Sequence, residues 1–223
     1  MKRRTLPVAT ALAATAALLL TACGGGEDDK SSDNDKIAGA DQGSKKPTKS
    51  AEPAGAASDK PDGVDVSLPK DMNLVFDWDK PKAKNEAAAM DDAANYLRAI
   101  YKGVHERTAD GAAVTAYSTG DGLHYAQVQI GDRLDGDWTA TGTRRFYDVS
   151  TRSSPNGKSV EVGFCSDATK FYGKEVKTGK VLKTDPSPRD FSHFKIIMVR
   201  FPTSDRLWQA SKVFVEEKAA KCQ

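Results

Sequence analysis

The residue types that most often carry acid–base or metal chemistry are thinly scattered along this 223-residue chain. Its only histidines are His105, His124 and His193, too few and too widely spaced for a recognisable metal motif. Asp33-Asn34-Asp35 begins like a calcium-binding loop, but the apolar residues that follow break the pattern. The sequence contains no P-loop, dinucleotide-binding, zinc-protease, nucleophile-elbow or C-x-x-C pattern. We therefore expect no catalytic residue set, no metal site and no cofactor.

The remaining reactive side chains are three cysteines, of which Cys23 is the most informative. It follows a positive segment, Lys2-Arg3-Arg4, and an uncharged apolar segment over residues 8–20, the order found in a secretory signal. The run Leu20-Thr21-Ala22-Cys23 resembles the lipobox of bacterial lipoproteins, whose cysteine receives a diacylglyceryl group with long acyl chains such as palmitate. We expect residues 1–22 to be a lipoprotein signal peptide. Lipid on Cys23 would then anchor the mature chain to the extracytoplasmic face of the cell membrane.

Two alternatives concern this N-terminal segment. An uncleaved transmembrane anchor is disfavoured, because the apolar run is shorter than the roughly 20 residues that span a bilayer. Arg3-Arg4 leaves twin-arginine export open beside the ordinary Sec route.

Cys165 and Cys222 are the other two cysteines. In an exported chain, an even number of remaining cysteines indicates a disulfide. With Cys23 carrying lipid, these two would form one bridge that ties the C-terminus to the domain. A reactive thiol is the alternative, but no nucleophile motif surrounds Cys165.

The charge balance argues against binding to nucleic acid. The chain has 33 basic and 31 acidic side chains. Three of the basic residues and none of the acidic ones lie in the expected signal peptide, so the mature chain has 30 basic against 31 acidic residues. The two signs are interspersed, without the concentrated positive patch that a nucleic-acid-binding protein needs.

Composition divides the mature chain near residue 70. Residues 23–70 are rich in Gly, Ser, Ala, Pro, Asp and Lys and contain no aromatic residue. Such a segment buries too little apolar surface to offset its ordering entropy, so we expect a disordered tether. A segment that binds wall polymer is the alternative. Residues 71–223 hold every aromatic residue and have the size of one domain.

Hydrophobic periodicity predicts helices first and strands afterwards. Apolar positions over residues 83–107 recur at helical spacing, and shorter helices are expected from Asp110, as the cap, to Tyr117 and over 123–134. Strands are expected at 73–78, 144–149, 160–164, 191–201 and 207–217, with a hairpin tip at 178–180. This order predicts an α+β domain whose N-terminal helices pack on one face of a curved antiparallel sheet.

The region from about residue 85 to residue 223 resembles secreted actinobacterial lipoproteins with an NTF2-like domain. The residues that carry the resemblance are Tyr96, Tyr101, the runs 138–142 and 160–167, Thr178-Gly179-Lys180, Leu207-Trp208 and Lys221-Cys222. The resemblance implies a cone of helices against the sheet with a cavity between them, for which Tyr117, Phe146 and Trp208 are candidate lining residues. It implies no activity, since the NTF2-like fold hosts enzymes, binders and scaffolds alike.

Two classes of function follow. The first is a non-catalytic surface module that binds a cell-wall component, a surface protein or a small apolar ligand. The second is a cavity enzyme of the isomerase or dehydratase type, because NTF2-like enzymes place an acid or a base inside the cavity. The candidates for that chemistry are His193 and Asp148, with Tyr117, Tyr125 and Tyr147 as donors. Such residues more often occupy exposed or satisfied positions, so we favour the first class.

Overall fold

The computed structural model describes residues 64–203 and 207–223. Outside these ranges lie the expected signal peptide and residues 23–63 of the expected tether, which include Cys23. Within them, no helix is long and apolar enough to cross a membrane. The helices are α1 (Lys84–Glu106), α2 (Ala112–Tyr117) and α3 (Gly120–Asp135), with 3-10 turns η1 (Pro188–Asp190) and η2 (Ala220–Cys222). The strands are β1 (Met72–Phe76), β2 (Trp138–Ser153), β3 (Ser159–Glu175), β4 (Val181–Leu182), β5 (Phe191–Arg200) and β6 (Trp208–Glu217).

The strands form one sheet in the order β1-β2-β3-β5-β6, with β4 paired to β3. Adjacent strands from β2 to β6 are antiparallel, as predicted. The prediction of an entirely antiparallel sheet is wrong at β1, which runs parallel to β2 with Met72 opposite Gly142. Parallel neighbours need a long crossover between them, and α1, α2 and α3 supply it.

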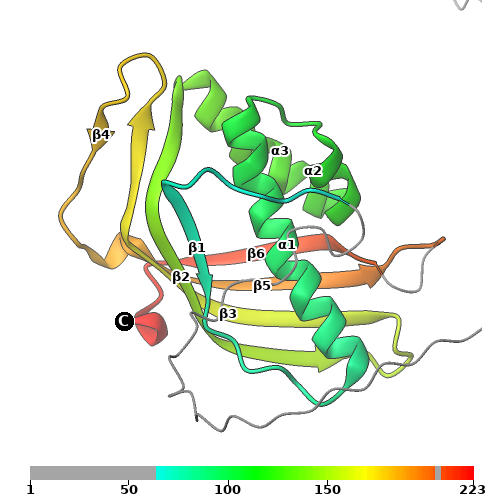
Figure 1. Ribbon diagram of the computed structural model, residues 1–223. Helices are drawn as coiled ribbons and strands as arrows, with labels where there is room; N and C mark the ends of the chain where they lie inside the picture. Colours follow the sequence, from blue (N-terminus) through cyan, green and yellow to red (C-terminus); the bar gives the residue numbers. More distant parts are fainter. Residues whose placement is uncertain (1–63, 204–206) are drawn as a thin grey trace, which may run out of the picture. The chain divides into compact units, whose positions relative to one another are not determined.

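The three helices lie against one face of the sheet, which curls around them (Figure 1). We call this the inner face and the opposite one the outer face. The apolar side of α1 buries Tyr96, Leu97 and Ile100 in a core shared with Phe146 and Phe164 of the sheet. The predicted α+β architecture, with helices packed on a curved sheet, is thereby confirmed.

Irregularities in β2 and β3 bend the sheet. The register of β2 against β3 shifts between Thr143 and Arg145 and again between Tyr147 and Ser150. Gly142 has φ of 96°, and a Cβ atom there would lie 2.2 Å from the carbonyl oxygen of Lys170. Bulges bend a strand and increase its twist, so the ends of β2 and β3 continue past the bend as an arm that carries β4 (Figure 1).

The C-terminus folds back onto the outer face. Cys165 of β3 forms a disulfide with Cys222 of η2, with their Cα atoms 5.4 Å apart. The Tyr147 hydroxyl donates a hydrogen bond to the carbonyl oxygen of Cys222. The predicted cysteine pairing is therefore confirmed in the structure.

Three local features differ from the sequence prediction. The N-cap of α2 is Gly111 rather than Asp110, whose carboxylate instead accepts a hydrogen bond from Gln127 of α3 at 2.8 Å. β2 and β3 extend well beyond 144–149 and 160–164, because their outer ends pair with each other in the arm. Val66, placed in the tether by composition, is 1% exposed and packs in the core.

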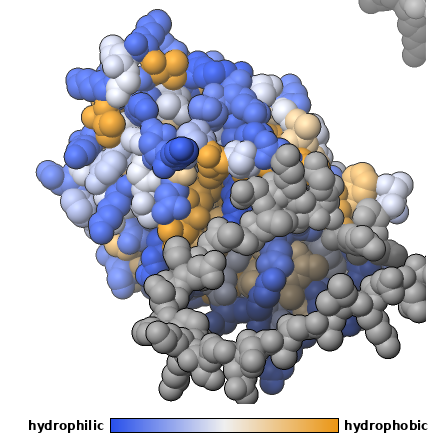
Figure 2. All heavy atoms as spheres, viewed as in Figure 1, coloured by the Kyte–Doolittle hydropathy of each residue, from blue (hydrophilic) through white to orange (hydrophobic). Residues whose placement is uncertain are grey.

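The surface seen in Figure 2 is mainly hydrophilic, with a strip of hydrophobic side chains near the position of β1. β1 is an edge strand, and its residues Leu74, Val75 and Phe76 are only partly buried. Hydrophilic side chains therefore cover most of this face, and one of its apolar patches follows the edge of the sheet.

Candidate functional site

The three candidate cavity residues lie deep in the core. Tyr117 and Phe146 have no exposed surface, and Trp208 is 1% exposed. None of them lines either of the two clefts described below. Their burial is that of packing residues in the core.

A polar cluster instead occupies the inner face near the bend of β3. Arg144 donates from Nε to the Ser166 hydroxyl at 2.8 Å and from Nη1 to the Tyr101 hydroxyl at 2.6 Å. Ser166 has no exposed surface and Tyr101 is 4% exposed, whereas Arg144 is only partly buried. The guanidinium thus joins β2 to β3 and to α1.

Two residues of α3 complete what we call the arginine–tyrosine cluster: Tyr101, Tyr125, Arg133, Arg144 and Ser166. The Arg133 guanidinium lies over the Tyr101 ring at 5.9 Å and over the Trp138 ring at 5.2 Å. The charges of both arginines act on the Tyr125 hydroxyl, which belongs to the same electrostatic environment.

The sheet register explains why these groups meet on the inner face. Phe146, Ser166, Ser192 and Glu217 are paired in one row across β2, β3, β5 and β6. Directly paired residues project to the same face, and Phe146 is buried beneath the helices. Ser166, Ser192 and Glu217 therefore share that face, with Glu217 exposed at its rim.

Cationic charge dominates the cluster. Among the described residues, no carboxylate lies within ion-pair distance of Arg133 or Arg144. Burial is the largest single influence and disfavours the Tyr101 phenolate, but the charges and hydrogen bonds of Arg144 and Arg133 together lower the pKa of Tyr101 below its ordinary value. Burial raises the pKa of Tyr125 to about 12. The cluster can donate hydrogen bonds and attract a negative group.

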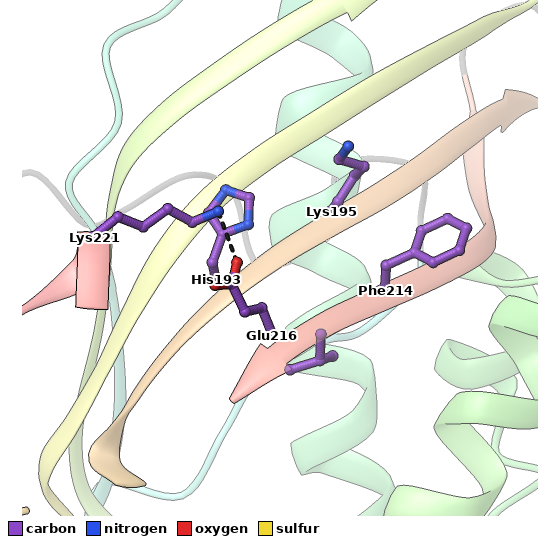
Figure 3. Close-up of a pocket in the computed structure, with 6 residues that line it drawn as sticks. His193, Lys195, Phe214, Glu216 and Lys221 are labelled. Carbon is purple, nitrogen blue, oxygen red and sulfur yellow. Dashed lines mark ion pairs between the residues drawn. The ribbon is translucent and has the colours of Figure 1, made fainter. Parts of the chain in front are cut away.

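His193 lies on the outer face, one residue away from the inner row. Tyr147, Cys165, His193 and Glu216 are paired across the four strands on the side opposite the helices. A cleft of about 230 Å³ is lined there by His193, Lys195, Phe214, Val215, Glu216 and Lys221, with Lys221 paired to Glu216 at 2.8 Å (Figure 3). Burial, followed by the charge of Lys221, lowers the pKa of His193.

The other sequence candidates for acid–base chemistry are also dispersed. Asp148 is exposed at the second bulge of β2, where its φ is 51°. The Tyr147 hydroxyl is bonded to the chain terminus, and burial followed by the charge of Asp167 raises its pKa. The structure therefore does not gather His193, Asp148 and Tyr147 at one inner site with Tyr117 and Tyr125.

A second cleft, of about 260 Å³, lies where the arm meets the end of α1. Its lining includes His105, Arg107 and Thr139, together with Asp71 and Lys174. Asp71 accepts from Lys174 at 2.8 Å, and that hydrogen bond lowers the pKa of Asp71. The Thr139 hydroxyl is buried without a hydrogen-bond partner among the described residues. Most of the charge in this cleft is already paired internally.

Sequence reasoning missed the arginine–tyrosine cluster as a site. The available signal was Arg144, a charged residue two positions before the apolar Phe146 in a strand that alternates. Alternation places both on one face, so an arginine on the core side was detectable. Its partners Tyr101, Arg133 and Ser166 could not be detected in the sequence, because long-range packing brings them to Arg144.

No protein-family model and no curated protein matches the chain. Among solved structures, the intermembrane-space region of the chloroplast protein ARC6 has a TM-score of 0.39 and 9% identity, covering 61% of this chain and 99% of that one. A ketosteroid isomerase-like protein from Erwinia carotovora atroseptica has a TM-score of 0.39 and 14% identity, covering 60% and 96%. A protein from Catenulispora acidiphila has a TM-score of 0.37 and 14% identity, covering 59% and 89%. At TM-scores below 0.5, these neighbours say nothing about what this chain binds or which reaction it performs.

Proposed function

We propose that this chain is a lipid-anchored protein of the extracytoplasmic membrane face whose folded part is a non-catalytic, NTF2-like binding module. The anchor would be the lipid on Cys23, and the bound partner a small ligand, a cell-wall component or another surface protein. The Cys165–Cys222 disulfide supports export, because such bonds persist in oxidising compartments.

The observation that carries the binding proposal is the arginine–tyrosine cluster. It holds hydrogen-bond donors in fixed positions on the inner face, through bonds from Arg144 to two different elements. Fixed donors lower the ordering cost of binding a polar group. The acid–base candidates His193 and Asp148 do not join the cluster, so it has the composition of a binding site more than of a proton-transfer site.

Anchoring is tested by replacing Cys23 with Ser in the full chain. The unmodified chain is expected in the membrane fraction as a mature-sized, acylated protein. The variant is expected in the medium or as an unprocessed precursor, because the acyl chains that hold the protein are missing. A variant that remained membrane-bound at mature size would contradict the anchor.

Binding is tested by native mass spectrometry of the mature chain carrying Cys23→Ser. A co-purifying small molecule whose occupancy falls in an Arg144→Gln variant would support a module that binds through the inner face. An Arg145→Gln variant is the control, because Arg145 is paired with Asp77 on the other face. Equal occupancy in both variants would contradict binding at the cluster.

A cavity enzyme of the isomerase or dehydratase type is the second candidate, and one observation favours it. The lowered pKa of Tyr101 between two guanidiniums is the kind of perturbation found at catalytic acids. The test is turnover of a substrate found by screening. A loss of about a hundredfold or more in kcat on Tyr101→Phe would favour the enzyme.

A further inference from the structure

Arg144 carries a partly buried positive charge that has no acidic partner among the described residues. Two of its donor atoms are bonded to neutral hydroxyls, and its guanidinium lies 5.5 Å from the ring centres of both Phe146 and Phe194. Its third donor atom, Nη2, makes no hydrogen bond to the described residues. Charges withdrawn from water are normally paired, because an isolated one loses its hydration. The environment of Arg144 therefore lacks a negative group.

Three of the exposed arginines of the domain behave differently. Arg107, Arg145 and Arg152 each pair with an aspartate or glutamate. Arg133 resembles Arg144: it is partly buried, lies over aromatic rings, and donates to its helix neighbour Gln129 at 3.2 Å rather than to a carboxylate. Arg133 and Arg144 are thus two partly buried arginines on the inner side that have no acidic partner among the described residues.

We infer that the arginine–tyrosine cluster binds the carboxylate of a small, singly charged organic acid with an apolar body. Arg144 Nη2 would donate to the carboxylate, with Arg133 and the Tyr125 hydroxyl contributing charge and a further donor. Arginine is suited to this role because its planar donors match a carboxylate. The inference rests on the proposed binding function and names the ligand class for the same site.

The surroundings of the cluster limit the ligand to one charge and favour an apolar body. Glu217 is exposed on the same face, and its negative charge acts on Tyr125, so a dianion would be repelled more strongly than a monoanion. Beside the cluster, Phe194 is paired with Val215, which is 36% exposed. Val215 therefore offers exposed apolar surface beside Phe194, whose ring centre lies 5.5 Å from the Arg144 guanidinium.

Octanoate is the probe, and calorimetry on the mature chain carrying Cys23→Ser is the measurement. Octanol and octyl phosphate have an unbranched alkyl body of similar length and differ from octanoate in charge. We expect octanoate to bind at least about tenfold more tightly than either. Arg144→Gln should weaken octanoate binding about tenfold or more and remove its preference over octanol, whereas Arg145→Gln should leave both unchanged.

Arg144→Lys is a second variant that should still fold, because lysine keeps the positive charge of Arg144. Lysine lacks the planar donors of arginine, so this variant should bind octanoate more weakly than the unsubstituted chain. Thermal unfolding of every variant identifies any that do not fold. Equal binding of octanol, tighter binding of octyl phosphate, or equal losses from Arg144→Gln and Arg145→Gln would overturn the carboxylate assignment while leaving a binding module in place. Absence of binding by all three probes would also overturn it, whereas the co-purification experiment decides the binding function separately.

Discussion

The Arg144 guanidinium donates to the Tyr101 hydroxyl across 2.6 Å, so that a strand of the sheet and the long helix share one charged hydrogen bond. Burial alone would raise the pKa of Tyr101, but the charges of Arg144 and Arg133 lower it. We therefore expect the pKa of Tyr101 to rise in Arg144→Gln, because the phenolate loses a neighbouring positive charge.

Tyrosinate absorbance at 295 nm measures this change, and Tyr101→Phe identifies which transition belongs to Tyr101. Arg145→Gln is the matched control, because the Arg145 guanidinium lies 4.7 Å from the ring centre of Tyr147 on the outer face. An unchanged Tyr101 transition in Arg144→Gln would show that the guanidinium does not set this pKa.

Glu86 links the start of α1 to the end of β2 and should make stability depend on acid pH. Its carboxylate accepts from the Thr151 hydroxyl at 2.9 Å, and from the Ser153 amide and hydroxyl at 3.1 and 2.9 Å. The Ser153 and Thr151 hydrogen bonds lower the pKa of Glu86 below 4.5. Its contribution is therefore complete above the unfolded pKa and is lost as pH falls through the folded pKa.

We expect Glu86→Gln to lower the free energy of unfolding by about 1 kcal/mol at pH 7 and by less at pH 3. Urea unfolding at the two pH values measures the difference. Asp132→Asn is the control, since the Asp132 carboxylate makes no hydrogen bond within the described residues. The same loss at both pH values would show that the charged form of Glu86 is not what stabilises the contact.

Gly122 allows α3 to lie directly against β6. A Cβ atom at this position would come within 2.1 Å of the Ala210 carbonyl oxygen. The Gly122 carbonyl also accepts from the Tyr96 hydroxyl at 2.7 Å, so the helix cannot move away without breaking a buried hydrogen bond. We expect Gly122→Ala to destabilise the domain by about 3 kcal/mol.

Gly131 provides the matched control in the same helix. A Cβ atom there would meet nothing within 4 Å. Gly131→Ala should therefore stabilise by about 0.5–1 kcal/mol, because alanine loses less backbone entropy in a helix. Chemical denaturation of both variants compares them directly, and a destabilising Gly131→Ala would show that the helix is constrained elsewhere.

Local patterns predicted the elements well, because they depend on spacing within a few residues. The α1 region was recognisable from its apolar positions, and the later strands from alternation. The parallel pairing of β1 with β2 could not be recognised in this way, because Met72 and Gly142 are brought together by a crossover about sixty residues long.

The bulges in β2 explain why the site was harder to predict than the fold. Strict alternation from Phe146 places Asp148 on the inner face. The register shift between Tyr147 and Ser150 instead leaves Asp148 exposed and packs Val149 against the core. A bulge of one residue turns the side chains that follow it to the opposite face of the sheet, and the amino-acid composition does not reveal it. The orientation of side chains in such a strand is therefore known only from its register in the three-dimensional structure.

The Cys165–Cys222 disulfide should contribute strongly to stability through the loop that it closes. The two cysteines are separated by 57 positions, and a loop of this length corresponds to about 4 kcal/mol in the chain-entropy description. Replacing both cysteines with alanine should lower the denaturant midpoint accordingly. The mature chain carrying Cys23→Ser is the reference, because it has the same anchor-free background and an intact bridge.

The loss should be accompanied by release of the C-terminal turn. Without the bridge, η2 keeps the hydrogen bond from the Tyr147 hydroxyl to the Cys222 position and the backbone bond from Ala219 to Phe191. Hydrogen exchange at residues 219–223 should therefore accelerate more than exchange in α1, which contributes no residue to the bridge cluster of Cys165, Ala219 and Cys222. Equal acceleration in α1 and η2 would indicate that the disulfide acts by limiting global unfolding and that the turn does not open on its own.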